Sequence, residues 1–322
     1  MVAGLARAMS ERKLLGTLLI GVLTLSCGAG STAEKMLVAH RGASAYVPEH
    51  TLEAYELAIE QGADFVEQDL QITSDGALVC LHDPTLERTT NVEELFPERS
   101  REVVWKGVKR QIWLLNDFTL NEVKQLDAGS WFDSEFAGAT IPTFREAIEL
   151  VLGRSGLFPE LKNPQIYTDL ETSFEELMLQ TLREYDLAEP GRNQKTPVIV
   201  QSFDEEILKR LKNDLGCRLP LVFLVSREMG DSRLSSAGLR KIREFAGGIG
   251  PSKHLLYDDR DIVIRAHDLG LKVTPYTFNS THLIPQFESA AEEMSYFLYD
   301  LGVDSLFTDN PDLFPRAPLV DF

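Results

Sequence analysis

Short apolar runs alternate with longer segments of helical periodicity over most of the chain. Runs rich in β-branched residues, separated by amphipathic segments, are typical of a parallel sheet with helical crossovers. Eight such runs predict strands at 37–40, 64–72, 157–161, 197–202, 219–225, 247–251, 271–278 and 304–309. Because eight β/α repeats are enough to close a parallel sheet, we expect an α/β TIM (β/α)8 barrel, with its active site at the C-terminal ends of the strands.

Helices are expected between most of these strands. Thr143 followed by Glu146 has the spacing of a capping box, and Gly62 follows the first helical segment as a C-terminal signal. The predicted helices cover residues 51–61, 143–152, 168–186, 204–214, 235–246, 258–269 and 281–299.

A ninth apolar run, 77–82, follows the turn tripeptide Ser74-Asp75-Gly76 and predicts a hairpin with the strand 64–72. Pairing the two strands across this turn brings His82 opposite Asp69, to within one residue. The hairpin therefore returns His82 to the acidic end of the preceding strand.

Residues 84–142 break the repeat and predict an inserted small subdomain over the barrel mouth. Thr119 and Glu122 form a second capping-box pattern within it. The segment contains three tryptophans and a basic cluster: Trp105, Trp113, Trp131, Arg99, Arg101, Lys106, Lys109 and Arg110. These residues fit either a packed lid with a solvated basic face or a wall that restricts the substrate.

The N-terminus has a different character. Three basic residues precede the apolar run 14–26, which has the length of a signal-peptide core and is too short to span a membrane. Residues 1–26 are therefore expected to be an export signal that sends the chain to the periplasm. Cys27 is a candidate lipidated first residue with 27–35 as a flexible tether, while the small residues 31–33 offer ordinary cleavage as the alternative.

The composition, with 43% hydrophobic and 25% charged residues, is that of a soluble globular protein. The net charge is −18 at pH 7, and a chain beginning at Cys27 would carry −20, because residues 1–26 carry +2. Such an acidic surface disfavours nucleic acid as a partner, and a phosphate-bearing substrate would need a local cationic site. Cys80 and Cys217 lack the spacing of a zinc site and are expected to be separate buried thiols.

Polar residues that end three predicted strands carry the candidate chemistry. His40 and Arg41 close the first strand and place a proton carrier beside an anion clamp. Glu67 and Asp69, two apart on the second strand, share one face. Glu160 near the end of the third strand adds a third carboxylate, and three carboxylates without a histidine or cysteine ligand favour one hard cation, Ca²⁺ or alternatively Mg²⁺.

The two histidines at the rim predict acid-base catalysis. His40 and His82 are expected on either side of a phosphorus centre, where one imidazole accepts a proton from the nucleophile and the other protonates the leaving alkoxide. Arg41 and Lys162 are expected to neutralise the phosphodiester charge. The residues do not decide which imidazole is the initial base.

The motifs HRGAS, PEHT, EQDL, LHD, PELK, QSF, GIGP, PYT and LFTDNPD, in this order and spacing, resemble the glycerophosphodiester phosphodiesterase family and above all its bacterial periplasmic members. The resemblance covers about residues 36–315 and leaves 316–322 as a tail. Many relatives have Asn where this chain has His50, which leaves the role of His50 open. The resemblance implies two catalytic histidines, two phosphate-binding cations and three metal ligands: His40, His82, Arg41, Lys162, Glu67, Asp69 and Glu160.

The resemblance also implies hydrolysis of glycerophosphodiesters, such as glycerophosphocholine or glycerophosphoethanolamine, to sn-glycerol 3-phosphate and an alcohol, with calcium as the cation of the periplasmic type. The nucleophile is either the glycerol 2-hydroxyl, which gives a cyclic phosphate, or water. Two alternatives stay open: a lysophospholipase D or phosphoinositide-type phospholipase, and a surface binding lipoprotein. The chain lacks the obvious basic or aromatic membrane-docking face that the first alternative would use. The second alternative would not need all seven site residues. A homodimer is open in every case.

Overall fold

The computed structural model describes residues 34–168 and 172–319. The expected export signal at 1–26 and the candidate lipidation site at Cys27 lie outside these residues and stay predictions. Across the described ranges, no helix combines the length and the apolar character that crossing a membrane requires.

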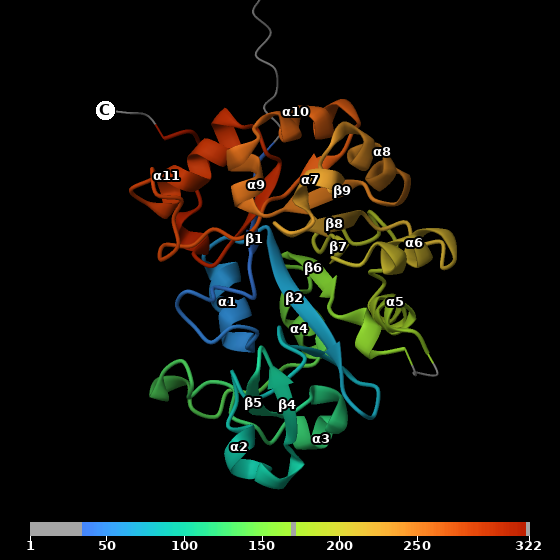
Figure 1. Ribbon diagram of the computed structural model, residues 1–322, viewed down its shortest axis with the longest axis vertical. Helices are drawn as coiled ribbons and strands as arrows, with labels where there is room; N and C mark the ends of the chain where they lie inside the picture. The colour runs from blue at the N-terminus through green and yellow to red at the C-terminus, as the bar shows by residue number, and fades with distance from the viewer. Residues whose placement is uncertain (1–33, 169–171, 320–322) are drawn as a thin grey trace, which may run out of the picture. The chain divides into compact units, whose positions relative to one another are not determined.

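Eight parallel strands in the described ranges form a TIM barrel, as the apolar pattern predicts (Figure 1). The sheet runs in the order β10-β9-β8-β7-β6-β2-β1-β11. The ring is completed where the amides of Asp304 and Phe307 donate to the carbonyls of Val273 and Pro275, both at 3.0 Å. In chain order the strands are β1 (Met36–Ala39), β2 (Phe65–Ile72), β6 (Gly156–Leu161), β7 (Val200–Ser202), β8 (Leu221–Val225), β9 (Gly248–Pro251), β10 (Lys272–Val273) and β11 (Ser305–Thr308).

Helices surround the barrel and bury their apolar faces against the outer side of the strands (Figure 1). The six that follow predicted segments are α1 (Leu52–Glu60), α4 (Phe144–Val151), α5 (Phe174–Glu184), α6 (Glu205–Asn213), α8 (Ser236–Phe245) and α10 (Asp261–Asp268). The shorter ones are α2 (Val92–Leu95), α3 (Leu120–Val123), α7 (Gly230–Arg233), α9 (Lys253–Asp258) and α11 (Ala290–Ser295).

Several predicted elements are shorter than their patterns indicated: 168–186 forms only α5, 197–202 only β7, and two others have a clear local cause. The helix expected over 281–299 begins only at Ala290, where the Ser289 side chain caps it, and it continues as a π-helix over Tyr296–Asp300. The strand expected over 271–278 pairs regularly only as β10, because Pro275 has no amide hydrogen to donate to a ladder. Local capping and the missing donor therefore override the apolar periodicity.

Apolar side chains fill the inside of the barrel beneath its C-terminal end. Phe158 of β6 makes edge contacts with Phe65 of β2 and Phe307 of β11, at centroid distances of 5.8 and 5.1 Å. Because alternate strand residues share a face, Glu67 and Glu160 lie on the same inner face, one step further toward the strand ends. The aromatic layer thus forms the floor on which the polar site rests.

The predicted hairpin is present, with β3 (Leu78–Cys80) pairing antiparallel to β2. Leu70 pairs with Cys80, which puts Leu81 opposite Asp69 and shifts the expected partner by one residue, within the stated margin. The shift arises because the loop holds three residues, with Gly76 at a φ of +84°. Cys80 and Cys217 are separate free thiols, although Cys217 is only half-buried.

Residues 84–142 pack around a second hydrophobic cluster, which includes Trp113, Leu115 and Phe118 and is joined by Val79 and Leu81 from the hairpin. The strands β4 (Arg101–Trp105) and β5 (Val108–Ile112) form a hairpin on its surface. Lys109 of the basic cluster is 72% exposed. These features fit the packed lid with a solvated basic face, and among the described residues none of 84–142 lines the barrel pocket.

Both predicted capping boxes are formed, and the one at Thr143 offers a test of local stability. The Thr143 side chain accepts a hydrogen bond from the Glu146 amide, and the Glu146 carboxylate accepts one from the Thr143 amide. We expect Thr143→Ala to lower the free energy of unfolding by about 1 kcal/mol in urea titrations. Ser173, which precedes α5 and makes no side-chain cap hydrogen bond, is the matched control. Ser173→Ala should lower the free energy of unfolding by only a few tenths of that amount. Equal losses would contradict the account.

Candidate active site

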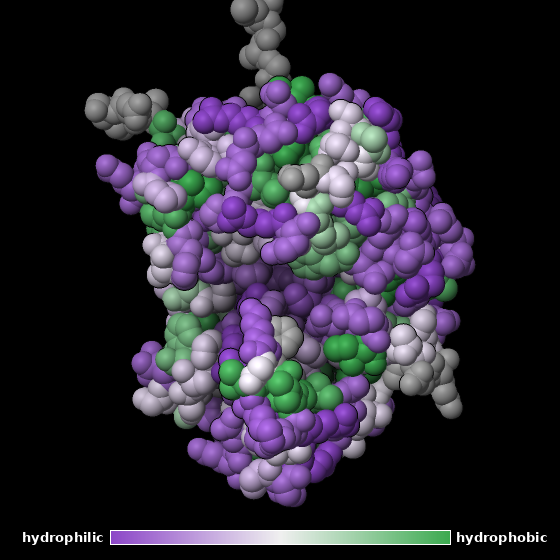
Figure 2. All heavy atoms as spheres, in the orientation of Figure 1, coloured by the Kyte–Doolittle hydropathy of each residue, from purple (hydrophilic) through white to green (hydrophobic). Residues whose placement is uncertain are grey.

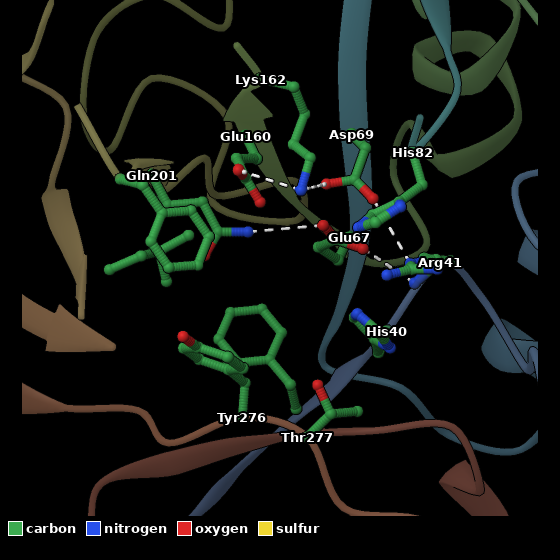
Figure 3. A pocket seen from close by; sticks show the side chains of 13 residues that line it. His40, Arg41, Glu67, Asp69, His82, Glu160, Lys162, Gln201, Tyr276 and Thr277 are labelled. Atoms are coloured by element: carbon green, nitrogen blue, oxygen red, sulfur yellow. Dashed lines mark hydrogen bonds and ion pairs between the residues drawn. The ribbon is translucent and has the colours of Figure 1, made fainter. Parts of the chain in front are cut away.

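The C-terminal ends of the strands surround a pocket that brings together all seven residues that the sequence singles out (Figure 3). The opposite wall adds apolar and aromatic side chains from four further strand ends. The face around the pocket is hollowed between the barrel and the inserted subdomain, and hydrophilic residues line the hollow (Figure 2). The complete lining is His40, Arg41, Glu67, Asp69, His82, Glu160, Lys162, Gln201, Phe203, Leu224, Tyr276, Thr277 and Phe307.

Three buried carboxylates form the centre of the pocket. Glu67 and Asp69 come from β2 and are each 1% exposed, and Glu160 of the neighbouring β6 pairs in register with Asp69. Burial and the nearby Asp69 raise the pKa of Glu67 well above its usual value. Burial, partly opposed by Lys162, raises the pKa of Glu160 to about 8. If all three were ionised, the carboxylates would carry more negative charge than the two cationic side chains of the pocket compensate.

Two cationic side chains contact these carboxylates. The Lys162 ammonium lies 3.3 Å from Glu160 Oε1 and 3.6 Å from Asp69 Oδ1. Arg41 Nε lies 3.4 Å from Asp69 Oδ2, and the Arg41 backbone amide donates to Glu67 at 2.8 Å. Burial alone would raise the pKa of Asp69, but Lys162, His50 and Arg41 together hold it well below its usual value. Asp69 is thus the ionised member of the set.

The two rim histidines are each oriented by a carboxylate. His40 Nδ1 lies 2.6 Å from Asp309 Oδ1, and burial would raise the pKa of Asp309, but His40 and Arg41 lower it. His82 Nδ1 lies 2.7 Å from Asp83 Oδ1. Burial lowers the pKa of His82, although the bond to Asp83 opposes that shift. Both imidazoles therefore have one ring nitrogen fixed by an acid, which leaves Nε2 for the pocket.

His50, whose role the sequence left open, is buried and contacts Asp69. Its Nε2 is 2.9 Å from Asp69 Oδ2 and its Nδ1 is 2.8 Å from the Tyr55 hydroxyl. Burial lowers the pKa of His50 to about 4, in spite of Asp69, so the ring is neutral at physiological pH. Ligand atoms of His50, Glu67 and Asp69 lie within 4.8 Å of one another, and these three residues form a candidate metal-binding triad.

Sequence reasoning missed two further polar residues of the site. The Gln201 amide lies 3.5 Å from Glu67 Oε1, and its own buried oxygen has no partner among the described residues. Glu49 accepts a hydrogen bond from Arg41 Nη1 at 3.0 Å. A polar residue inside the buried run 197–202 was the available signal for Gln201. Glu49 lies within the PEHT motif, but its partner is set by the path of a loop.

Comparisons with known proteins agree with this geometry. The model of the glycerophosphoryl diester phosphodiesterase family matches residues 40–313. A glycerophosphodiester phosphodiesterase of Bacillus subtilis is 35% identical over 291 residues, which covers 88% of this chain and 86% of the relative. One of Arabidopsis thaliana is 31% identical over 355 residues, with 94% and 95% covered.

Among solved structures, a phosphodiesterase of Oleispira antarctica in complex with the product sn-glycerol-3-phosphate aligns with a TM-score of 0.65. It is 28% identical, and the alignment covers 87% of this chain and 94% of that one. Fold and pocket together define a TIM-barrel phosphodiesterase. The chain belongs to the glycerophosphoryl diester phosphodiesterase family, which confirms the resemblance of its motifs and the expectation that it is an enzyme.

The turn that positions Arg41 provides a test of how the site is built. Gly42 has a φ of +87°, and a Cβ there would lie 2.6 Å from the Ala54 backbone. Gly76 has a φ of +84° but open space around it. Both alanine variants have the strain of a positive φ, so they differ only by the clash at position 42. We therefore expect Gly42→Ala to lower the free energy of unfolding in urea by about 1–3 kcal/mol more than Gly76→Ala does.

The same pair separates effects on activity. Gly42→Ala should displace the Arg41 amide from Glu67 and abolish turnover, whereas Gly76→Ala should keep wild-type turnover. Equal losses of stability and activity in the two variants would contradict this role of the turn.

Proposed function

We propose that the protein hydrolyses glycerophosphodiesters to sn-glycerol 3-phosphate and an alcohol with the help of one divalent cation. The observation that carries the proposal is the charge of the pocket: three buried carboxylates face two cationic side chains. With all three carboxylates ionised, a bound divalent cation would turn this site positive, which suits a phosphodiester anion. Membership of the family and the product named for the Oleispira antarctica structure support the same substrate class.

The residues present fit such a cation. Glu67 and Asp69 belong to the candidate triad with His50 and also to the all-oxygen set with Glu160. We favour the all-oxygen set, because His50 has both ring nitrogens within 2.9 Å of other partners and because Ca²⁺ and Mg²⁺ prefer oxygen ligands. His50 would then hold Asp69 in position. The ion, Ca²⁺ or alternatively Mg²⁺, would neutralise charge on the phosphoryl oxygens.

The protein side chains supply the proton transfers. An oxygen nucleophile, either the glycerol 2-hydroxyl or water, attacks phosphorus and gives its proton to one imidazole, His40 or His82. The bond between phosphorus and the leaving oxygen breaks, and the other imidazole, as imidazolium, protonates the alkoxide. Arg41 and Lys162 stabilise the charge on the phosphoryl oxygens. The attack by the 2-hydroxyl gives a cyclic phosphate, which water opens in a second step.

Export to the periplasm, with Cys27 as the candidate lipidated residue, is a separate proposal that rests on the sequence of residues 1–35 alone. It has no bearing on the chemistry of the pocket, and fractionation of cells that express wild type and Cys27→Ala would test it.

Metal dependence is tested by removal and return of the ion. EDTA should abolish hydrolysis of glycerophosphocholine, and excess Ca²⁺ or Mg²⁺ should restore it, because the carboxylates then recover their counter-charge. EGTA in the presence of excess Mg²⁺ distinguishes the two ions, since it removes mainly calcium. Turnover that resists both chelators would contradict the proposal.

Acid-base catalysis is tested by replacing each rim histidine. His40→Ala and His82→Ala should each lower kcat by at least ~10², the usual scale for general acid-base groups. His267 is the matched control, because its Nε2 lies 2.9 Å from Asp304 Oδ2, a His-Asp pair that does not line the pocket. His267→Ala should keep near-normal kcat. A folded His82→Ala variant with near-normal kcat would refute the role of His82.

A further inference from the structure

A continuous chain of ion pairs joins the catalytic candidate His82 to the phosphate-binding candidate Arg41 by a path outside the pocket. Within the described residues, the three inner members of this path do not line the pocket: they are Asp83, Arg88 and Glu49. They come from separate segments, because Glu49 precedes α1, Asp83 follows the β2–β3 hairpin, and Arg88 belongs to the inserted subdomain. The path therefore joins the loop between β1 and α1 to the beginning of the inserted subdomain.

Every contact along this path is within hydrogen-bonding distance. His82 Nδ1 lies 2.7 Å from Asp83 Oδ1, and the other Asp83 oxygen accepts from Arg88 Nε. Arg88 Nη1 and Nη2 donate to the two Glu49 oxygens at 3.0 and 2.7 Å. Glu49 Oε1 also accepts from Arg41 Nη1 at 3.0 Å. A single guanidinium thus holds two carboxylates at once.

The charges along the path compensate one another. The Glu49 side chain is 13% exposed, and burial would raise its pKa, but Arg88 and Arg41 lower it to about 2. The shared carboxylate is therefore ionised and bridges two guanidinium groups. Only the planar fork of an arginine offers three N–H donors in this arrangement, since a lysine ammonium makes a point contact.

We infer that Arg88 is a positioning residue that fixes His82 and Arg41 relative to each other through Asp83 and Glu49. The inference rests on the proposed roles of His82 and Arg41. General acid-base catalysis requires the imidazole within hydrogen-bonding reach of the reacting oxygen, and a misplacement of 1 Å costs on the order of 10² in rate. The inserted subdomain thereby contributes to catalysis without lining the pocket.

The test compares Arg88→Ala with Arg99→Ala on glycerophosphocholine with added calcium. Arg99 is the matched control because it lies in the same subdomain and pairs with Glu122 at 2.8 Å, away from the pocket. We expect Arg88→Ala to lower kcat/KM by ~10–100-fold, by lowering kcat and also raising KM, since both His82 and Arg41 lose their support. Arg99→Ala should stay within about twofold of wild type in both constants.

Two further measurements separate positioning from a general loss of folded protein. Methylguanidinium should restore part of the activity of Arg88→Ala, whereas the same concentration of methylammonium should not, because the fork is what is missing. Arg88→Lys, which keeps the charge, should recover little. It also tests the inference should the alanine variant fail to fold.

The outcomes are distinct. Three results would overturn the inference. They are a kcat/KM of Arg88→Ala within about twofold of wild type, an unchanged KM with a lowered kcat in that variant, or full activity in Arg88→Lys. A wild-type protein without activity on glycerophosphocholine would instead overturn the proposed function, before any variant is compared.

Discussion

The repulsion among three buried carboxylates is the constraint on which the site depends. Glu67, Asp69 and Glu160 occupy one polar layer above an aromatic floor, where the low dielectric strengthens every charge interaction. Lys162 and Arg41 offset part of this repulsion. The repulsion and the burial that they do not offset raise the pKa values of Glu67 and Glu160. The cation that we propose would offset this repulsion and would connect the geometry of the pocket to phosphodiester chemistry.

The surroundings of that layer hold each charged group in one place. Asp309 and Asp83 orient the two imidazoles, and a hydrogen bond with His50 holds Asp69. Arg41 reaches Glu67 with its backbone and Asp69 with its side chain, because its φ of +59° and the following Gly42 turn the chain sharply. The opposite wall of the pocket carries apolar and aromatic side chains, among them Phe203, Leu224 and Tyr276. Catalytic positioning thus comes from loops fixed on a rigid barrel.

Much of the fold and of the site follows from the sequence, because both depend on local spacing. Strand periodicity predicts the barrel, and the two-residue step predicts that Glu67 and Asp69 share its inner face. The contacts of Glu49, His50 and Arg88 were not predictable, since they join loops whose relative paths depend on the whole fold. The hairpin register moved by one residue because the loop length was set by Gly76, which the apolar pattern does not encode.

The central claim, that the carboxylate layer binds one divalent cation, is tested most directly by calorimetric titration of the metal-free protein with Ca²⁺ and with Mg²⁺. The account predicts one ion per chain for the wild type and an affinity weakened by at least ~10-fold in Glu67→Gln. At pH 7 it also predicts proton release on binding, seen as a heat that varies with the buffer, because Glu160, with a pKa of about 8, must lose its proton to act as a ligand. Absence of binding, or equal affinity in wild type and Glu67→Gln, would contradict the account.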